Sequence, residues 1–212
     1  MYILSKNIEF PPVEHADIDG LLAIGGDLSQ ERLLLAYRSG IFPWYNEGEP
    51  IIWYSPDPRM VLFPEELKVS KSMKQVLRKN EFTVTFNQDF KGVIENCATV
   101  KRPDQEGTWI TNDMQQAYIQ LHKSGYAMSV EVWKDEELVG GLYGMWLQEK
   151  KMFCGESMFA KVSNASKLGF ISLVAMLKEK EVQLIDCQVY TDHLASLGAR
   201  EISRKAFLNY LK

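Results

Sequence analysis

The fold is set by the stretch AMSVEVWKDEELVGGLYGMWLQEKKMFCGESMF, residues 127–159. Met128, Val130 and Val132 alternate with polar residues, which is the two-residue period of a half-buried strand. The charged turns KDEE and QEKK each separate two apolar runs. Because turns this short join antiparallel neighbours, the stretch predicts a meander of three antiparallel strands.

The sequence on both sides of this meander extends the sheet. Residues 164–180 predict a long helix, and QLIDCQVY (183–190) predicts a buried strand because its apolar run is nearly continuous. The C-terminal stretch LASLGAREISRKAF (194–207) predicts a helix, a glycine turn, a short strand and a last helix or strand. Upstream, KSMKQVLRKN (71–80) predicts a helix and EFTVTF (81–86) a strand. This order predicts an α+β fold with a mixed sheet flanked by helices.

Residues 1–64 differ in composition from the rest, because they hold most of the prolines and one clear helix candidate, Gln30–Ser39. Ser29 can cap the start of that helix. The stretch GIFPWYNEGEPIIWYSPDPR (40–59) is punctuated by proline, so it predicts a rigid loop more than regular structure. We therefore predict a small N-terminal α/β domain over 1–64 and a larger domain over 65–212.

Composition and charge exclude several classes of protein. The chain has 212 residues, 46% of them hydrophobic and 25% charged, as in ordinary globular domains. Its net charge of −4 argues against a protein coated in positive charge, although a local basic patch can still bind nucleic acid. Three cysteines without CxxC spacing and three histidines without ligand spacing predict no disulfide framework and no metal site. Lacking a secretory signal and an apolar run of roughly 18 residues, the sequence predicts a cytoplasmic protein without a membrane partner.

A basic helix is the first candidate functional feature. Lys71, Lys74 and Arg78 are spaced i, i+3 and i+7, so they share one helical face, and residues 68–79 contain no acid. Such a face can contact consecutive phosphates of a nucleic acid. A solvated surface face fits the spacing equally well.

The carboxylate of Glu156 is the second candidate, because it interrupts the apolar strand FCGESMF (153–159). Strict alternation places Phe153 and Phe159 on one face and Glu156 on the other, unless a bulge intervenes. A buried carboxylate needs a partner or a cationic ligand, such as an amino group. An internal salt bridge or a solvent-facing edge is the alternative.

Asp186 and Gln188, in IDCQV (185–189), form the third candidate. Two positions apart on a strand, they should project from the same face. A carboxylate beside a carboxamide fits a catalytic centre. It fits equally a hydrogen-bonded pair that fixes the adjacent chain.

Aromatic residues in predicted loops form the last candidate set: Trp44, Tyr45, Trp53, Tyr54 and Trp109. Loop aromatics can wall an apolar pocket or stack on a base. They can also pin a small domain to a large one, which is the expectation for Trp53 and Tyr54.

Segments spread over most of the chain carry a resemblance to one family. They are GLLAIGGDLS (20–29), GIFPWY (40–45), WYSPDPR (53–59), SKSMK (70–74), GTWIT (107–111), SVEVW (129–133), ELVGGLYG (137–144), FCGESMF (153–159), NASK (164–167), LIDCQV (184–189) and HLASLGAREISR (193–204). In this order they resemble the leucyl/phenylalanyl-tRNA–protein transferases. The resemblance implies an acetyltransferase-like (GNAT-like) C-terminal domain and no metal or organic cofactor. It implies transfer of Leu or Phe, and less well Met, from aminoacyl-tRNA to proteins with N-terminal Arg or Lys, which marks them for N-end-rule degradation.

The same resemblance implies roles for individual residues. Asp186 and Gln188 would belong to the catalytic centre, with Glu156 near the α-amino group of the aminoacyl end. The pocket for the side chain and terminal adenosine would include Trp44, Trp109 and Phe153, and the tRNA acceptor stem would contact Lys71, Lys74 and Arg78. Leu142, in the pocket wall, stands where the family often has Met, and its similar volume should preserve the pocket. Thr191 stands where Asn is common, so it receives no role.

The implied reaction is aminolysis of an ester by an amine whose unperturbed pKa is about 8. Positioning can then supply on the order of 7–11 kcal/mol of the barrier reduction. We hypothesise that the Gln188 carboxamide oxygen accepts a hydrogen bond from the attacking amine, while Asp186 orients Gln188 or attracts developing positive charge. Three rivals remain: a peptidoglycan-building aminoacyl transferase, an acetyl-CoA-dependent acetyltransferase and an RNA-binding module. The acetyltransferase usually has a Q/R-x-x-G-x-G/A loop, which KVSNASKLGF (161–170) lacks.

Overall fold

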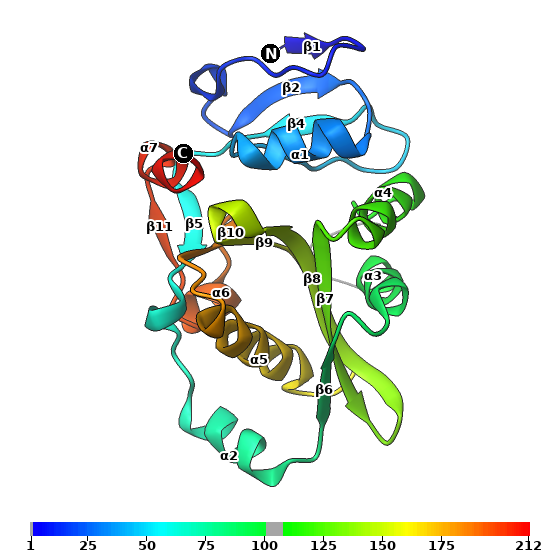
Figure 1. Ribbon diagram of the computed structural model, residues 1–212, viewed down its shortest axis with the longest axis vertical. Coiled ribbons are helices and arrows are strands. Elements are labelled where there is room, and N and C mark those ends of the chain that lie inside the picture. The colour runs from blue at the N-terminus through cyan, green and yellow to red at the C-terminus, as the bar shows by residue number, and fades with distance from the viewer. Residues whose placement is uncertain (1, 101–107) are drawn as a thin grey trace.

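The computed structural model describes residues 2–100 and 108–212, and within these ranges the strands form two sheets, seen in Figure 1. The larger sheet has the order β11-β5-β10-β9-β8-β7-β6. In chain order its strands are β5 (Arg59–Leu62), β6 (Thr83–Phe86), β7 (Ala127–Lys134), β8 (Glu137–Leu147), β9 (Met152–Ala160), β10 (Leu184–Gln188) and β11 (Arg200–Ile202). The predicted meander is confirmed, since β7, β8 and β9 pair antiparallel.

The sheet is mixed because β10 runs parallel to β9. The crossover helix α5 (Ala165–Glu179) joins these two strands and packs on one face of the sheet. On its other side β10 pairs antiparallel with β5, so every residue of β10 is buried, as its apolar run predicts. The predicted α+β architecture is confirmed.

The remaining helices begin where the sequence supplies capping side chains. The Oγ atoms of Ser29, Ser70 and Thr111 accept the backbone N–H three residues ahead. The helices are α1 (Gln30–Arg38), α2 (Lys71–Lys79), α3 (Phe90–Thr99), α4 (Asn112–Lys123), α6 (Asp192–Ser196) and α7 (Arg204–Leu208), with short 3-10 turns at Val13–His15, Pro64–Glu66, Gln148–Lys150 and Asn209–Leu211. Among the described residues, no helix has the length and apolar character that crossing a membrane requires.

The smaller sheet has the order β1-β2-β4-β3 and consists of β1 (Tyr2–Leu4), β2 (Leu21–Gly25), β4 (Ile52–Tyr54) and β3 (Phe42–Pro43). The predicted rigid loop at 40–59 therefore contains β3, β4 and the first residue of β5, because the pairing of β4 with β2 and β3 overrides its proline content. Trp53 was expected to pin the two domains together. It is buried in a cluster that includes residues from both parts of the chain, and its Nε1 donates to the Gly25 carbonyl at 2.9 Å.

Strand β5 bears on the predicted division at residue 64. It precedes that boundary, yet it lies inside the larger sheet between β10 and β11. The division itself stays a prediction, and the pairing of β5 favours placing it before Arg59.

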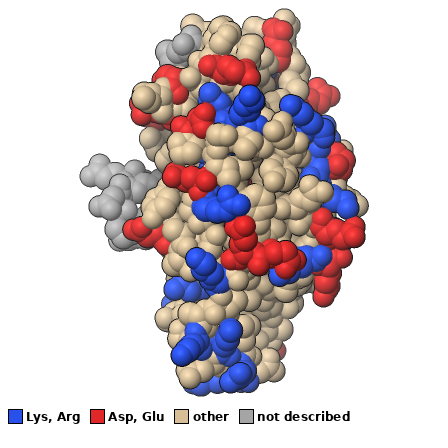
Figure 2. Space-filling view, turned by 90° about the vertical axis from the view of Figure 1, so that its left-hand side faces the viewer, with Lys and Arg blue, Asp and Glu red and all other residues tan. Residues whose placement is uncertain are grey.

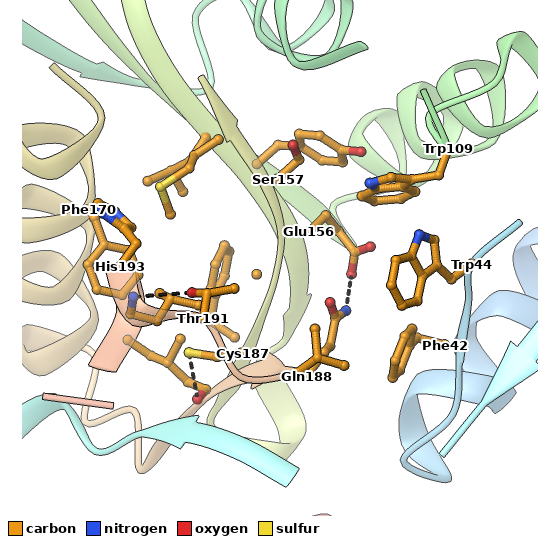
Figure 3. A pocket seen from close by; sticks show the side chains of 18 of the residues that line it. Phe42, Trp44, Trp109, Glu156, Ser157, Phe170, Cys187, Gln188, Thr191 and His193 are labelled. Carbon is orange, nitrogen blue, oxygen red and sulfur yellow. Dashed lines mark hydrogen bonds between the residues drawn. The ribbon is translucent and has the colours of Figure 1, made fainter. Parts of the chain in front are cut away.

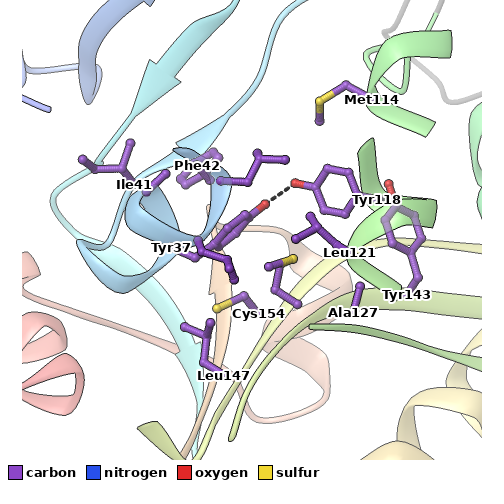
Figure 4. Packing of buried hydrophobic residues seen from close by; sticks show 14 of the residues in the cluster. Tyr37, Ile41, Phe42, Met114, Tyr118, Leu121, Ala127, Tyr143, Leu147 and Cys154 are labelled. Carbon is purple, nitrogen blue, oxygen red and sulfur yellow. Dashed lines mark hydrogen bonds between the residues drawn. The ribbon is translucent and has the colours of Figure 1, made fainter. Parts of the chain in front are cut away.

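Two buried clusters cover opposite faces of the larger sheet. One joins α1, α3 and α4 to the face that carries Cys154 and Phe159, and Figure 4 shows part of it. The other packs α5 against the face that carries Phe153 and Ile185. Phe153 and Phe159 thus lie on opposite faces, contrary to strict alternation.

A β-bulge explains this change of face. Tyr143 pairs with Ser157 and the next residue, Gly144, pairs with Gly155, so Glu156 has no partner on β8. The close approach of the strands needs glycine, because a Cβ at Gly144 would overlap the Cys154 carbonyl and the Phe153 ring. Glu156 lies on the same side of the sheet as Cys154, where it faces α1 and α4, and the bulge brings Phe159 to that side as well.

Candidate active site

A cavity opens where β9 and β10 separate. The two strands pair from Leu184 opposite Met152 to Asp186 opposite Cys154, and β9 then continues to Ala160 against β8 alone. The cavity has a volume of about 380 Å3. It is lined by Phe42, Pro43, Trp44, Trp109, Leu142, Tyr143, Phe153, Gly155, Glu156, Ser157, Met158, Phe170, Ile185, Cys187, Gln188, Val189, Thr191, His193 and Leu194.

Side chains from different elements form the opposite walls of the cavity, as Figure 3 shows. Phe170 of α5 and His193 of α6 lie on one side, and the indole rings of Trp44 and Trp109 lie on the other. Trp44 is 43% exposed and therefore stands at the mouth. All four residues predicted to bind substrate, namely Trp44, Trp109, Leu142 and Phe153, line this one cavity.

Glu156 lies at the edge of the cavity with its carboxylate held by neutral donors. The hydroxyl of Tyr37 donates to Oε1 at 2.7 Å and the hydroxyl of Tyr118 to Oε2 at 3.1 Å. The two hydroxyls also contact one another, as drawn in Figure 4. Nε2 of Gln188 donates to Oε1 at 3.1 Å. No cation pairs with Glu156 among residues 2–100 and 108–212. Within these ranges Glu156 therefore forms no internal salt bridge, which was the alternative to a ligand-binding role.

The carboxyl of Glu156 is poised to change its protonation near neutral pH. Burial is the main cause that raises its pKa to about 7, and the nearby charge of Asp186 adds to the rise. Hydrogen bonds from Tyr37, Tyr118 and Gln188 act in the opposite direction. A cation that entered the cavity would find an unpaired acid there.

Gln188 reaches the cavity because β10 contains a second bulge. Asp186 pairs with Val61 and Gln188 with Met60, so Cys187 is the extra residue, and Gln188 adopts a left-handed φ of 65°. Nε2 of Gln188 donates to Glu156. Its Oε1 accepts no hydrogen bond from the described part of the chain and is available to a ligand.

Asp186 lies behind the cavity, not in its lining. Its carboxylate is 1% exposed and receives two hydrogen bonds from Arg59, from Nε at 2.8 Å and Nη2 at 2.7 Å. Oδ1 also accepts the backbone N–H of Gln188 at 3.0 Å. Of the predicted pair only Gln188 lines the cavity, although the two residues remain hydrogen-bonded.

The sequence did not single out Arg59, Tyr37 or Tyr118. Arg59 had one usable signal, because a charge at the start of the apolar strand RMVL needs a buried partner. The tyrosines gave none, since Tyr37 and Glu156 are 119 residues apart.

The predicted tRNA-binding residues lie apart from the cavity, on α2. Lys71, Lys74 and Arg78 are exposed and have no ion-pair partner within the described ranges. Met73 is buried and anchors the helix, which turns the basic face outward. In Figure 2 the lower end of the molecule, where Figure 1 places α2, carries a group of basic side chains.

The described residues include no group of three or more His, Cys, Asp or Glu side chains placed to hold a metal ion. Gly107, the first residue of the GTWIT segment, lies outside the described residues, whereas Trp109 lies within them.

Comparison with known proteins supplies the context for this geometry. The family described as leucyl/phenylalanyl-tRNA protein transferase matches residues 61–212, and its N-terminal domain matches residues 26–57. A leucyl/phenylalanyl-tRNA–protein transferase from Flavobacterium johnsoniae is 62% identical over 212 residues, which covers 100% of this chain and 99% of that one. The corresponding protein of Christiangramia forsetii is 59% identical over 211 residues, with 100% of both chains covered.

Similar solved structures are more distant. The structure of L-PGS from Bacillus licheniformis is 14% identical with a TM-score of 0.45, covering 82% of this chain and 57% of that chain. A GCN5-related N-acetyltransferase from Kribbella flavida is 9% identical with a TM-score of 0.37, covering 80% and 60%. The sequence relatives carry the assignment: the chain is an aminoacyltransferase that moves an amino acid from tRNA to a protein. With a family match over residues 61–212 and 62% identity along its length, the chain belongs to the leucyl/phenylalanyl-tRNA–protein transferase family.

Proposed function

We propose that this chain transfers Leu or Phe, and less readily Met, from aminoacyl-tRNA to the N-terminal Arg or Lys of acceptor proteins. The product would carry a new N-terminal residue that marks it for N-end-rule degradation in the cytoplasm. The observation that carries the proposal is a buried acid, Glu156, without a cation partner in the described chain, at the edge of an apolar cavity beside the free carboxamide oxygen of Gln188.

The cavity suits an aminoacyl end. Glu156 would bind the α-amino group of the aminoacyl residue. The side chain of that aminoacyl residue would enter the apolar part of the cavity, lined by Leu142, Phe153 and Phe170. The terminal adenosine of the tRNA would stack at Trp44 and Trp109. A volume of about 380 Å3 is ample for a Leu or Phe side chain with part of the ribose.

The reaction balances without a cofactor. The acceptor amine attacks the ester carbonyl, a C–N bond forms, the bond to the ribose oxygen breaks, and the amine's proton ends on that leaving oxygen. The α-amine of the acceptor has an unperturbed pKa of about 8, so an appreciable fraction of it is neutral at pH 7. Oε1 of Gln188 would accept a hydrogen bond from the attacking amine and hold it in line, because a neutral carboxamide is too weak a base to remove the proton.

The tRNA itself would contact the basic face of α2. Lys71, Lys74 and Arg78 are exposed and unpaired within the described ranges, so they are available to consecutive phosphates of the acceptor stem. These contacts carry no information about the amino acid, which the cavity would select.

A direct assay tests the proposal. The protein is mixed with labelled Phe-tRNA, Leu-tRNA, Met-tRNA or Val-tRNA and a peptide that begins with Arg, and the label is followed into the peptide. We expect transfer with Phe and Leu, weaker transfer with Met, and little with Val because its β-branch does not fit. The matched control peptide begins with Glu and should receive no label. Equal transfer to both peptides, or transfer only to a cell-wall precursor, would refute the proposed acceptor.

A further inference from the structure

Arg59 is a buried cation in the larger sheet. It begins β5, is 1% exposed and does not line the cavity. Nε and Nη2 donate to the two carboxylate oxygens of Asp186 at 2.8 Å and 2.7 Å. Nη1 donates to the carbonyl of Gly40 at 3.2 Å. The guanidinium thus has hydrogen-bond acceptors on both of its sides.

Two aromatic rings enclose the same guanidinium. Its central carbon lies 4.7 Å from the ring centroid of Phe42 and 4.6 Å from that of Phe207. Stacking fixes the plane of a guanidinium, and a bidentate pair then fixes the plane and position of the carboxylate. A lysine in this place would keep the charge but lose the planar fork. The position of Asp186 is therefore set by Arg59.

Asp186 in turn supports the backbone of Gln188. Its Oδ1 accepts the Gln188 N–H at 3.0 Å, across the bulge in β10. Gln188 has a φ of 65°, a conformation that residues with a side chain adopt infrequently. The hydrogen bond that its N–H donates to Asp186 supports this conformation.

We propose that Arg59 is a positioning residue of the transfer reaction: through Asp186 it holds the Gln188 carboxamide at the cavity. The inference rests on the proposed function for its kinetic consequence. Arg59 is itself held by Gly40 and Phe42 of the N-terminal domain and by Phe207 of α7. Segments outside the cavity therefore set the geometry inside it.

The decisive variant is Arg59→Lys, with Arg200→Lys as its matched control. Arg200 also makes a bidentate pair, with Glu66 at 2.9 Å and 3.3 Å, and also lies 4.6 Å from an aromatic ring, that of Phe63, but it is exposed and outside the cavity. With enzyme in excess over labelled Phe-tRNA and saturating Arg peptide, the single-turnover rate constant reports the transfer step. Because the limiting Phe-tRNA sets the amplitude of that reaction, the active fraction of the enzyme is measured separately, by stoichiometric titration of Phe-tRNA binding. We expect Arg59→Lys to lower the rate constant by roughly 30-fold to 100-fold with an undiminished active fraction, because small misplacements of a positioning group cost that much. Arg200→Lys should stay within about 2-fold of wild type.

A purely structural role predicts the opposite pattern, a reduced active fraction with an unchanged rate constant, and that result would overturn the proposal. The double variant Arg59→Lys/Asp186→Asn supplies a second test. If both residues act through one path, the double variant is no slower than the slower single variant. Multiplicative losses would contradict that path.

Amide exchange of Gln188 gives a readout that does not depend on activity. The N–H of Gln188 should exchange at least about 10-fold faster in Arg59→Lys than in wild type, and unchanged protection would overturn the proposal. Should Arg59→Lys fail to fold, Phe207→Leu loosens the guanidinium from one side and should also speed this exchange, and unchanged exchange there would count equally against the proposal. Absence of transfer by the wild-type protein would instead refute the proposed function, while the exchange result would still decide the role of Arg59.

Discussion

The carboxyl of Glu156 shows how one buried residue links stability to pH. Its pKa is about 7 in the folded protein against 4.5 for a free side chain, chiefly because of burial. The folded state therefore binds a proton that the unfolded state has already lost between these two values. The resulting stabilisation is fully present below about pH 4.5 and is lost as the pH rises through about 7.

Glu156→Gln should remove this dependence, because the amide does not titrate. Between pH 5 and pH 8, the free energy of unfolding of the variant should gain on that of wild type by on the order of 3 kcal/mol. Urea unfolding of both proteins at several pH values measures the difference. If the free energies of unfolding of the two proteins instead change in parallel with pH, Glu156 is already ionised at pH 5 in the folded protein.

Gln188→Glu separates positioning from base catalysis. A carboxyl at this position would lie beside Glu156, and two adjacent carboxyls share a proton. In its protonated form the new side chain copies glutamine, since its O–H donates to Glu156 and its carbonyl oxygen still faces the amine. We expect the variant to be at least about 10-fold more active than Gln188→Ala at pH 6.5, and to lose that advantage by pH 8.5 as both carboxyls ionise.

The profile of kcat/KM against pH for wild type, Gln188→Glu and Gln188→Ala tests this expectation. Gln183→Glu, an exposed residue just before β10, controls for added charge. Activity of Gln188→Glu that rises with pH would instead identify a carboxylate base at position 188.

At the scale of elements, local signals were sufficient for the strands but not for their bulges. The meander follows from alternation and short charged turns, which act over a few residues. The bulge opposite Gly144 follows from the close approach of a neighbouring strand, and alternation within FCGESMF contains no trace of it. The family resemblance named several residues of the cavity lining, such as Trp44 and Phe153, and alternation placed Glu156 on the face of Cys154. The position of Asp186 behind the lining could not be predicted.

Helix α2 carries a prediction of its own. Reversing two charges, in Lys71→Glu/Lys74→Glu, should weaken binding of aminoacyl-tRNA by at least about 10-fold at low salt. It should also reduce the slope of log affinity against log salt by about 2, because each lost phosphate contact contributes close to one unit. Transfer from a minimal aminoacyl-adenosine should be unchanged, since α2 does not line the cavity.

Binding titrations at 50–200 mM salt measure both quantities. Lys91→Glu is a suitable control, because Lys91 is an exposed residue of α3 whose neighbour Glu95 lies one turn away. Equal losses in the α2 variant and the control would reduce the effect to net charge, and loss with the minimal substrate would place α2 at the reaction itself.

At the scale of the whole molecule, the two sheets share one site. Tyr37 of α1 reaches Glu156 across 119 residues of sequence, and Arg59 reaches Asp186 across 127. Contacts at such separations leave no periodic signal, so the residues could not be brought together from the pattern alone. The resemblance to a family placed Glu156 and Gln188 in one site, and the packing of the domains adds the tyrosines that hold the acid.

Tyr37→Phe should therefore alter catalysis from within the N-terminal domain. Removing this hydroxyl takes away a hydrogen bond that lowers the pKa of Glu156, so that pKa should rise above about 7, by roughly half to one unit. If the ionised carboxylate binds the α-amino group, kcat/KM at pH 7 should fall about 2-fold to 5-fold and recover at pH 8.5.

Tyr45→Phe is the matched control, because Tyr45 also bridges the domains, through Thr111 at 3.3 Å, without contacting Glu156. Profiles of kcat/KM from pH 6 to 9 should show the acid limb moved to higher pH in Tyr37→Phe alone. A loss of equal size at every pH would assign Tyr37 to packing, and coincident profiles would mean that Tyr118 and Gln188 suffice to set the protonation of Glu156.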